Sequence, residues 1–320
     1  MSSNPTRDRV NTQDESEHKR LPPWLRVKFN NNRAYHEVGA LMQDQSIHTV
    51  CQEALCPNRG ECWGAGTATY LLLGDVCTRA CKFCDVKHGK PGPLDWEEPE
   101  RIAQSVKAMK LEHAVVTSVN RDERRDGGAP IFAMLIRRIR QLQPGCSVEV
   151  LIPDFKGSLE ALKIVMDARP DILNHNLETI PGLFKTIQPQ SSYQASRSTL
   201  VNAKKLNADA LTKSGLMVGL GETLDEIKET MQEIQSWDVD ILTIGQYLQP
   251  SKNHLAVERF YPPEEFEELK EYGLELGFKW VESAALVRSS YHAAEQVRAL
   301  RARPRTKAGA AEAATGTDRS

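Results

Sequence analysis

The chain has 320 residues, of which 40% are hydrophobic, enough for one large α/β domain or two ordinary domains with a substantial core. Lys and Arg (41) nearly balance Asp and Glu (43), which excludes the strongly basic character of a nucleic-acid-binding protein. No apolar run is long enough to cross a bilayer, and the polar N-terminus does not resemble a signal peptide. We therefore expect a cytoplasmic enzyme with no nucleic acid and no membrane among its partners.

The N-terminal part of the chain has three sections. Residues 1–20 are charged and lack apolar periodicity, which predicts disorder. Residues 21–66 form an N-terminal extension that begins with two prolines and the hydrophobic residues Trp24 and Leu25. Because proline disfavours helix, we expect this arm to lie extended across the surface. A short helix is predicted over residues 34–43.

The first group of cysteines, Cys51, Cys56 and Cys62, ends this extension with the spacing C-x4-C-x5-C. The residues between them are rich in turn formers, which suits a chain that wraps around an iron–sulfur cluster. Six thiolates shared in one zinc or iron site is an alternative, but each group of three would then lack ligands.

A second group, Cys77, Cys81 and Cys84, has the spacing C-x3-C-x2-C and follows the apolar run 69–74. Three thiolates can hold three corners of a four-iron cluster and leave one iron open for chemistry, whereas structural zinc usually takes four protein ligands. A zinc knuckle and a ferredoxin-like loop are the alternatives. Seven cysteines without a secretory signal indicate metal or redox chemistry in a reducing compartment. Cys146 is most simply a small buried hydrophobic residue.

From residue 67 to 295, apolar β-branched runs alternate with helical patterns. Strands are predicted at 68–74, 113–119, 147–153, 171–177, 214–220 and 240–246, and helices near 98–110, 131–142, 158–168, 195–208, 223–236 and 263–276. This alternation predicts a parallel sheet covered by helices on both faces, either an open doubly wound sheet or a complete or partial barrel. Residues 296–320 are expected to be a disordered tail.

Polar residues at the predicted strand ends are candidates for the site, because the loops at these ends build the site in both architectures. They are Thr117, Ser118, Asn120, Arg121, Asn176, Glu178 and Gln246. Two neighbouring features have simpler explanations. His175 has no second His or Cys nearby and fits a core histidine, and residues 122–126 could be a solvated charged loop.

The two cysteine groups together resemble one family. The segments 60–64, 66–69, 117–122, 174–179, 213–222, 245–250 and Arg288-Ser289-Ser290-Tyr291 are similar to lipoyl synthase, within the radical S-adenosylmethionine (radical SAM) superfamily. The chain departs from the usual family pattern in the charged loop 121–128 and in residues 188–193.

The resemblance implies a fold, an activity and a set of site residues. The fold would be α/β, a partial (β/α)6 TIM-type barrel whose mouth is closed by N- and C-terminal extensions. The activity would be a radical insertion of two sulfur atoms into a protein-bound octanoyl-lysine chain, performed by a sulfurtransferase of lipoate biosynthesis. Cys77, Cys81 and Cys84 would hold the [4Fe-4S] cluster that binds S-adenosylmethionine. Contacts to this cofactor would come from Thr117, Ser118, Asn120, Arg121, Asn176 and Glu178.

The second [4Fe-4S] cluster implied by the resemblance is an auxiliary one that donates sulfur. Cys51, Cys56 and Cys62 would be its cysteine ligands and Ser290 its fourth, with an ordinary turn hydroxyl as the alternative role for Ser290. Implied partners are octanoylated lipoyl carrier domains of 2-oxoacid dehydrogenases, the glycine cleavage H protein, an electron donor such as flavodoxin or ferredoxin, and an iron–sulfur cluster carrier. The alternative functions are a two-cluster methylthiotransferase and an iron–sulfur electron carrier.

Overall fold

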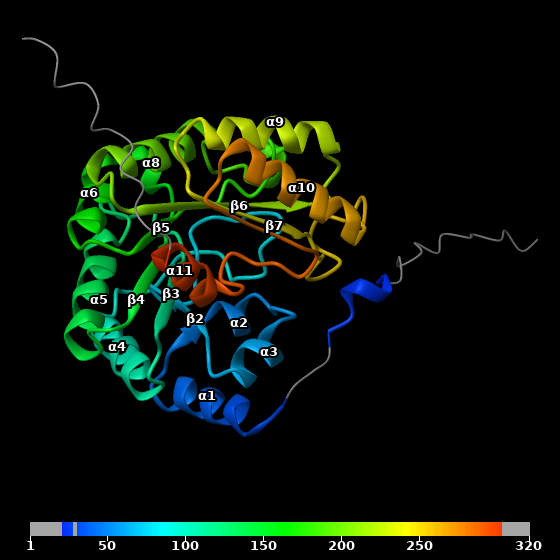
Figure 1. Cartoon of the computed structure of the whole chain (residues 1–320). Helices are drawn as coiled ribbons and strands as arrows, with labels where there is room; N and C mark the ends of the chain where they lie inside the picture. Colours follow the sequence, from blue (N-terminus) through cyan, green and yellow to red (C-terminus); the bar gives the residue numbers. More distant parts are fainter. Residues whose placement is uncertain (1–20, 28–30, 303–320) are drawn as a thin grey trace, which may run out of the picture.

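One sheet of eight strands, paired in chain order, organises the computed structural model, which describes residues 21–27 and 31–302 (Figure 1). Strands β2 to β8 run parallel, and β1 is antiparallel to β2. In the described chain β8 does not pair with β1, so the sheet forms a partial barrel. The strands are β1 (His48–Thr49), β2 (Thr69–Leu72), β3 (His113–Ser118), β4 (Ser147–Leu151), β5 (Ile172–Asn174), β6 (Leu211–Val218), β7 (Ile241–Gln246) and β8 (Trp280–Ser283).

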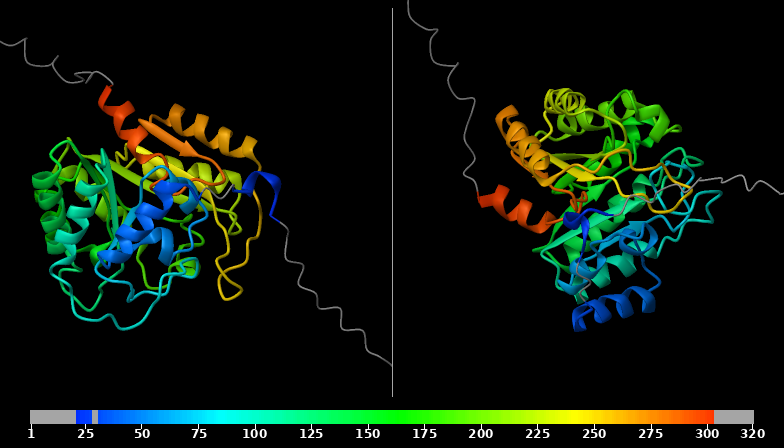
Figure 2. Two further views of the ribbon diagram at one scale, coloured as in Figure 1. Left: turned by 90° about the horizontal axis from the view of Figure 1, so that it is seen from below. Right: turned by 90° about the vertical axis from the view of Figure 1, so that its right-hand side faces the viewer.

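Helices lie on the outside of this sheet (Figures 1 and 2). Because they cover the sheet, its central strands are buried on both faces, as in β7, where all six residues are buried. The helices that alternate with the strands are α4 (Glu98–Ala108), α5 (Ala129–Leu142), α6 (Leu159–Asp167), α7 (Phe184–Ile187), α8 (Tyr193–Leu206), α9 (Leu224–Gln235) and α10 (Pro263–Leu276). A 3-10 turn, η2 (Phe155–Gly157), precedes α6.

Local sequence signals explain where two of these helices begin. Helix α9 starts with a capping box in which the Thr223 side chain accepts from the backbone N–H of Glu226, and the Glu226 carboxylate accepts from that of Thr223. Helix α5 follows Gly128, whose φ of 85° lies in the left-handed region. A Cβ at Gly128 would also collide with the Leu73 side chain, so only glycine fits here.

The N- and C-terminal extensions meet each other at the open side of the barrel. The N-terminal extension contains η1 (Pro23–Leu25), α1 (Arg33–Asp44), α2 (Val50–Glu53) and α3 (Arg59–Gly64), and the C-terminal one ends in α11 (Ala293–Ala302). The Asn58 side-chain amide donates to the carbonyl of Leu286 at 2.7 Å, and the Tyr291 hydroxyl donates to a Glu61 carboxylate oxygen at 3.1 Å. Figure 2 shows the N-terminal extension in blue and the C-terminal extension in red.

A buried polar cluster links α11 to the strands. Lys213 on β6 and Glu149 on β4 are both 0% exposed and their charged atoms lie 3.0 Å apart. Gln296 of α11 accepts a hydrogen bond from the Lys213 ammonium at 3.0 Å. Val297 packs on Ile172 and Ile241, which lie at the starts of β5 and β7. Helix α11 therefore covers the N-terminal end of the barrel.

The predicted fold class is confirmed, and all six predicted strands are present. The structure adds two strands, β1 and β8. β1 has only two residues, too few for a periodic pattern, and sequence periodicity did not mark β8 because Trp280 and Glu282 are only partly buried. Strand β6 begins at Leu211 rather than 214, and β5 is shorter than predicted.

Two predictions about the extensions need correction. The predicted disordered tail from 296 is wrong for residues 296–302, which belong to α11, because Ala293 and Val297 bury one face of that helix. The N-terminal arm is not fully extended, because Pro23–Leu25 form the 3-10 helix η1, which buries Leu25 and leaves Trp24 40% exposed. The predicted disorder of residues 1–20 and 303–320 lies outside the described residues.

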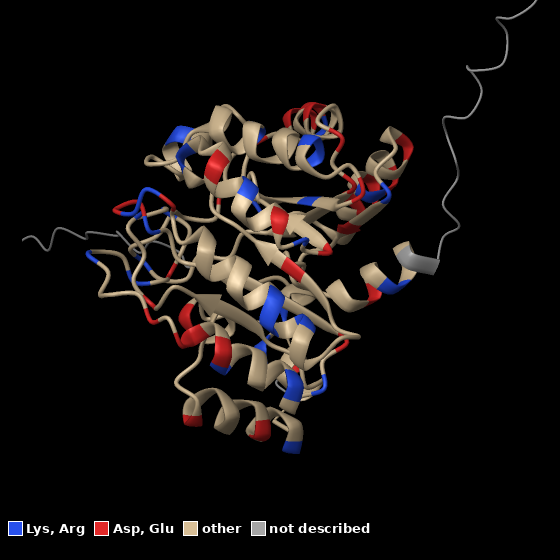
Figure 3. Cartoon of the chain, turned by 90° about the vertical axis from the view of Figure 1, so that its left-hand side faces the viewer, with Lys and Arg blue, Asp and Glu red and all other residues tan. Residues whose placement is uncertain are grey.

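The outer surface carries charges of both signs. Figure 3 shows Lys and Arg interspersed with Asp and Glu along the outer helices. Among the described residues, no helix combines the length and the apolar character needed to span a membrane.

Candidate functional site

A cavity of about 520 Å³ inside the barrel brings both cysteine groups together. All six cysteines that the sequence singled out line it, and so does Ser290. The seventh, Cys146, is buried elsewhere in the core, as predicted. The two groups, separated by 14 residues between Cys62 and Cys77, thus face a common space.

The second cysteine group lies on the loop after β2, at the C-terminal end of the strands. Cys77 is held by its N–H, which donates to the carbonyl of Lys87 at 2.8 Å. Its sulfur accepts two backbone N–H bonds, from Arg79 at 3.4 Å and from Asn120 at 3.3 Å. These donors are suited to stabilising a thiolate at this position.

Loops from the far side of the barrel hold the rest of this cysteine loop. The Lys82 N–H donates to the carbonyl of Ile187 at 3.0 Å, and the Leu255 N–H donates to that of Lys82 at 3.3 Å. A His254 ring nitrogen lies 3.2 Å from the carbonyl oxygen of Cys84. The loop is therefore fixed at both ends before any metal is bound.

The first cysteine group approaches the cavity from the opposite end of β2. Cys51 lies in α2, directly after the short strand β1, which pairs with β2. Thr69, the first residue of β2, donates its hydroxyl to the Ser290 hydroxyl at 2.8 Å. The backbone of Thr69 also lies beside the Cys51 thiol, where it acts against the burial that raises the pKa of this thiol. Ser290 and Cys51 thus share one neighbour across 239 residues of sequence.

Burial raises the pKa of four cavity cysteines, Cys51, Cys62, Cys81 and Cys84, in the metal-free chain. It raises the pKa of Cys62 and of Cys81 to about 12, and the neighbouring cysteines of each group add to the effect. Burial likewise raises the pKa of Cys84 to about 11 and raises that of Cys51. Bound iron would offset this cost, because a cation favours thiolates.

The arrangement of these thiols fits an iron–sulfur cluster better than a single ion. Among residues 21–27 and 31–302, no three His, Cys, Asp or Glu side chains converge closely enough to hold one metal ion. A four-iron cluster does not need such convergence, since each thiolate binds a different iron. Three free thiols on each side of the cavity are the donor set that clusters use.

Five of the six predicted cofactor contacts line the cavity: Thr117, Ser118, Asn120, Asn176 and Glu178. Within the described chain, Ser118 Oγ and Asn176 Oδ1 are buried without a hydrogen-bond partner. Such buried polar atoms are costly unless a ligand or water satisfies them. They mark the side of the cavity where a polar ligand fits.

Glu178 is a strongly perturbed carboxylic acid in the cavity. Burial raises the pKa of its carboxyl to about 7, although a hydrogen bond from Asn176 at 3.1 Å and the charge of Arg288 act in the opposite direction. Its φ of 71° lies in the left-handed region, which is unusual for a residue other than glycine. Strain of this kind is concentrated at functional sites.

Arg121, the sixth predicted contact, does not line the cavity. Its guanidinium donates to the carbonyls of Leu73 at 3.0 Å and Gly92 at 2.7 Å, and it pairs with Glu123. It fastens the loop after β2 to the loop after β3. Its place in the sequence, next to Asn120 at a strand end, suggested a cofactor contact, but its side chain points away from the cavity.

His175 and Gln246, also singled out from the sequence, both line the cavity. His175 is buried, and a ring nitrogen bonds the carbonyl of Ile152 at 2.8 Å. Burial lowers its pKa, which favours the neutral ring, as a core histidine requires. The Gln246 amide donates to the carbonyls of Val218 and Arg259 and so ties the end of β6 to the loop before α10.

Arg288 is a cavity residue to which sequence reasoning assigned no role. It lines the cavity near Cys56 and Glu178, and burial lowers its pKa. The only hydrogen bond of its side chain in the described chain is to the carbonyl of Val287 at 2.6 Å. The run Arg288-Ser289-Ser290-Tyr291 was the available signal, but it drew attention only to the serine.

Family models match two parts of the chain. Residues 71–234 match the model of the Radical SAM superfamily, and residues 2–56 match that of the N-terminal domain of lipoyl synthase of the Radical SAM family. Each model covers one of the two cysteine groups in whole or in part.

Curated relatives are similar over most of their length. The chain is 55% identical to a lipoyl synthase of Rubrobacter xylanophilus, over 89% of this chain and 88% of the relative. It is 54% identical to one of Geobacillus kaustophilus, over 88% and 95% of the two chains.

Solved structures support the fold. The crystal structure of Streptococcus suis SuiB bound to S-adenosylmethionine superposes with a TM-score of 0.53 at 11% identity, over 67% of this chain and 49% of that one. HydG, a maturase of the [FeFe]-hydrogenase, gives 0.53 at 14%, over 67% and 50%. Identity over nearly the whole chain carries more weight, and we conclude that the chain belongs to the lipoyl synthase family of sulfur-inserting radical SAM enzymes.

Proposed function

We propose that the chain carries out lipoyl synthesis with two [4Fe-4S] clusters, one held by each cysteine group. The carrying observation is that both groups of three thiols line one cavity from opposite ends of β2. Cys77, Cys81 and Cys84 hold the cluster with the open iron, to which S-adenosylmethionine binds. Cys51, Cys56, Cys62 and Ser290 hold the cluster that donates sulfur.

The chemistry needs a cofactor because the reacting carbons of an octanoyl chain carry no acidic hydrogen for a general base. S-adenosylmethionine and its cluster, when bound, supply a radical that abstracts hydrogen from these carbons. The protein binds and orients the reactants. Ser118, Asn176 and Glu178 offer polar atoms to the cofactor, while Leu71, Val119 and Met217 give the cavity apolar surface for an alkyl chain.

The donor cluster has one weak ligand in this proposal. A hydroxyl binds iron less tightly than a thiolate, so Ser290 could release its iron while the three cysteines still hold the rest. The hydrogen bond from Thr69 holds the Ser290 oxygen at the start of β2, the end from which the first cysteine group approaches the cavity. This position is the support for Ser290 as ligand rather than turn residue.

The substrate and partners follow from this chemistry. We infer that octanoylated lipoyl carrier domains, of 2-oxoacid dehydrogenases or the glycine cleavage H protein, present the alkyl chain. A flavodoxin or ferredoxin would supply electrons, and a cluster carrier would rebuild the donor cluster. Free thiols in both groups suit a reducing, cytoplasmic location.

The test is anaerobic reconstitution followed by iron, sulfide and product analysis. We expect about eight irons and eight sulfides per chain, and about half of each when Cys77, Cys81 and Cys84 are replaced by Ala. That variant should not cleave S-adenosylmethionine. A Cys146→Ala variant is the matched control, because this buried cysteine lies outside the cavity.

The first group is tested in the same way. Replacing Cys51, Cys56 and Cys62 by Ala should leave S-adenosylmethionine cleavage intact and abolish sulfur insertion. Lipoyl product at the native rate from that variant would refute the donor assignment. Stoichiometric zinc in protein purified without oxygen would refute both clusters.

A further inference from the structure

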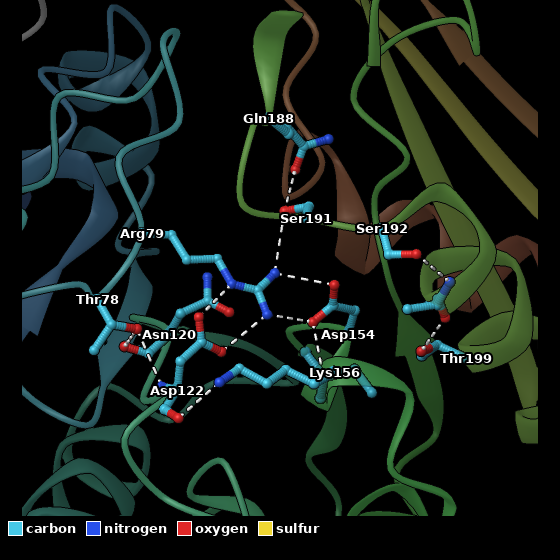
Figure 4. A network of polar contacts seen from close by, with 12 residues as sticks. Thr78, Arg79, Asn120, Asp122, Asp154, Lys156, Gln188, Ser191, Ser192 and Thr199 are labelled. Atoms are coloured by element: carbon cyan, nitrogen blue, oxygen red, sulfur yellow. Dashed lines mark hydrogen bonds and ion pairs between the residues drawn. The ribbon is translucent and has the colours of Figure 1, made fainter. Parts of the chain in front are cut away.

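Arg79 lies between Cys77 and Cys81, and its side chain is only 3% exposed. Figure 4 shows the polar residues around it. It donates two hydrogen bonds to Asp122, at 2.7 and 2.9 Å, and two to Asp154, at 2.6 and 3.0 Å. A fifth goes to the Ser191 hydroxyl at 3.1 Å. These five bonds use every N–H donor that a guanidinium has.

The three acceptors belong to three different loops. Asp122 follows β3, Asp154 follows β4, and Ser191 precedes α8, as Figure 4 shows. A single side chain therefore fastens the cysteine loop after β2 to the loops that follow the next three strands. Because bidentate pairs fix direction as well as distance, Arg79 also sets the orientation of that loop.

The charges in this cluster are maintained despite burial. Burial opposes ionisation of Asp154, but its hydrogen bonds from Arg79 and the charge of Arg79 hold its pKa below the usual range. For Arg79 the two carboxylates outweigh burial and raise its pKa. Lysine, with three donors at a single point, could not serve both carboxylates and the serine in this geometry.

The backbone beside Arg79 connects this clamp to a cysteine sulfur. The Arg79 N–H donates to Cys77 Sγ, and the Asn120 N–H donates to the same atom. Thr78 joins the two donor segments, because its N–H donates to the carbonyl of Asn120 and its hydroxyl accepts from the Asp122 N–H. The ion pair between Arg79 and Asp122 joins the same two segments a second time, through side chains.

We propose that Arg79 is a positioning residue that keeps these two N–H groups directed at the Cys77 sulfur. The inference rests on the proposed function, in which Cys77 is a ligand of the cluster that binds S-adenosylmethionine. Hydrogen bonds to cluster sulfurs stabilise the more negative, reduced form, so they raise the reduction potential. Loosening the clamp should therefore lower the potential without removing a ligand.

The experiment uses the full chain with Cys51, Cys56 and Cys62 replaced by Ala, so that one cluster is observed. Arg79→Lys and Asp122→Asn are compared with that parent in iron content, in an EPR-monitored redox titration and in cleavage of S-adenosylmethionine. Arg124→Gln is the matched control, since Arg124 pairs with Asp126 in the same loop and makes no bond to the cysteine loop.

We expect both variants to keep the parent's iron while the potential shifts to more negative values, more for Arg79→Lys than for Asp122→Asn. Cleavage should fall by roughly tenfold to a hundredfold for Arg79→Lys, the size of effect that small misplacements produce. In metal-free protein, the Arg79 and Asn120 amide hydrogens should exchange faster in both variants. The control should match the parent throughout.

Parent-like potential and amide exchange in Asp122→Asn would overturn the inference, and so would the same result in Arg79→Lys. If Arg79→Lys does not retain iron, Asp122→Asn decides, because Asp122 is partly exposed and its removal leaves the Asp154 pair in place. A parent that binds no cluster at all would overturn the proposed function instead.

Discussion

Ser290 is the residue whose role depends most on the fold, because only folding brings it beside Cys51 and Thr69. Replacing Ser290 by Ala should preserve S-adenosylmethionine cleavage, which does not involve this oxygen, while sulfur insertion falls by roughly a hundredfold or more. Ser290→Cys should keep the donor cluster assembled and also slow turnover, because a thiolate holds its iron more tightly. Product yield and iron content measure both effects.

Ser289 provides the matched control for this pair of variants. Its hydroxyl also lies in the cavity, where it accepts from the Asn176 amide at 3.3 Å. Ser289→Ala should leave donor-cluster iron at the native level. Equal product yields from the native chain and Ser290→Ala would leave Ser290 as a turn residue.

Glu178 predicts a pH dependence of stability in the metal-free chain. Its pKa rises from 4.5 to about 7 on folding, mainly through burial, so the folded state retains a proton that the unfolded state releases. The stability that this proton contributes is complete below pH 4.5 and is lost as the pH rises toward 7. Glu178→Gln cannot ionise and should avoid that loss.

We therefore expect the urea midpoint of Glu178→Gln to rise relative to the native chain between pH 4.5 and 7, and the difference to level off above 7. Comparison of the two chains cancels the other titrating groups. Glu271→Gln, on the exposed face of α10, should follow the native curve. A difference that shrinks with rising pH would contradict the burial of this carboxyl in the folded chain.

At the scale of elements, strands and helices with strong periodicity could be predicted and those with mixed faces could not. β7 was predicted to within a residue because all six of its positions are buried and the first five are apolar or small. β8 was missed because alternate positions are only partly buried and its four residues include Glu282. α11 was missed because its buried residues, Gln296 among them, include polar ones.

Gln296 joins α11 to the barrel and to the segment that carries Ser290. It accepts from Lys213 and donates to the carbonyl of Tyr291 at 3.1 Å, and it is fully buried. Gln296→Ala should cost about 1–3 kcal/mol in the free energy of unfolding, because the Lys213 ammonium and the carbonyl of Tyr291 each lose a partner. Urea unfolding of the metal-free chain measures this cost.

The same variant should lose donor-cluster iron faster on exposure to a chelator, since Tyr291 directly follows Ser290. Arg298→Ala, an exposed change on the same helix, should shift stability by no more than about 0.5 kcal/mol and leave the iron unaffected. Equal effects from the two variants would contradict a specific anchoring role for Gln296.

At the scale of the whole molecule, the candidate site was more predictable than its supports. Of the thirteen site residues expected from the sequence, twelve line the cavity, all but Arg121. Cysteine spacing and strand-end position identified eleven of them, and the resemblance added Ser290. The clamp made by Arg79 and the position of Arg288 in the cavity could not be predicted, because both depend on which loops approach from elsewhere in the barrel. The prediction that two extensions, distant in sequence, close the barrel also came from the resemblance rather than from periodicity.

Metal removal should open the molecule where the two extensions meet. In the described chain their hydrogen bonds include the pair from Asn58 to Leu286 and that from Tyr291 to Glu61, so much of their attachment would come from a cluster that both hold. A ligand that binds only the folded state stabilises the regions it joins.

We expect chelated protein to be cut by trypsin at Arg59 and Arg288 about tenfold faster or more, because local opening then costs less free energy. Cleavage at Lys163, on α6 at the outside of the barrel, should not depend on metal. Equal rates of cutting at Arg59 and Arg288 with and without metal would contradict this. The extensions would then close the barrel by themselves, and the donor cluster would not stabilise their contact.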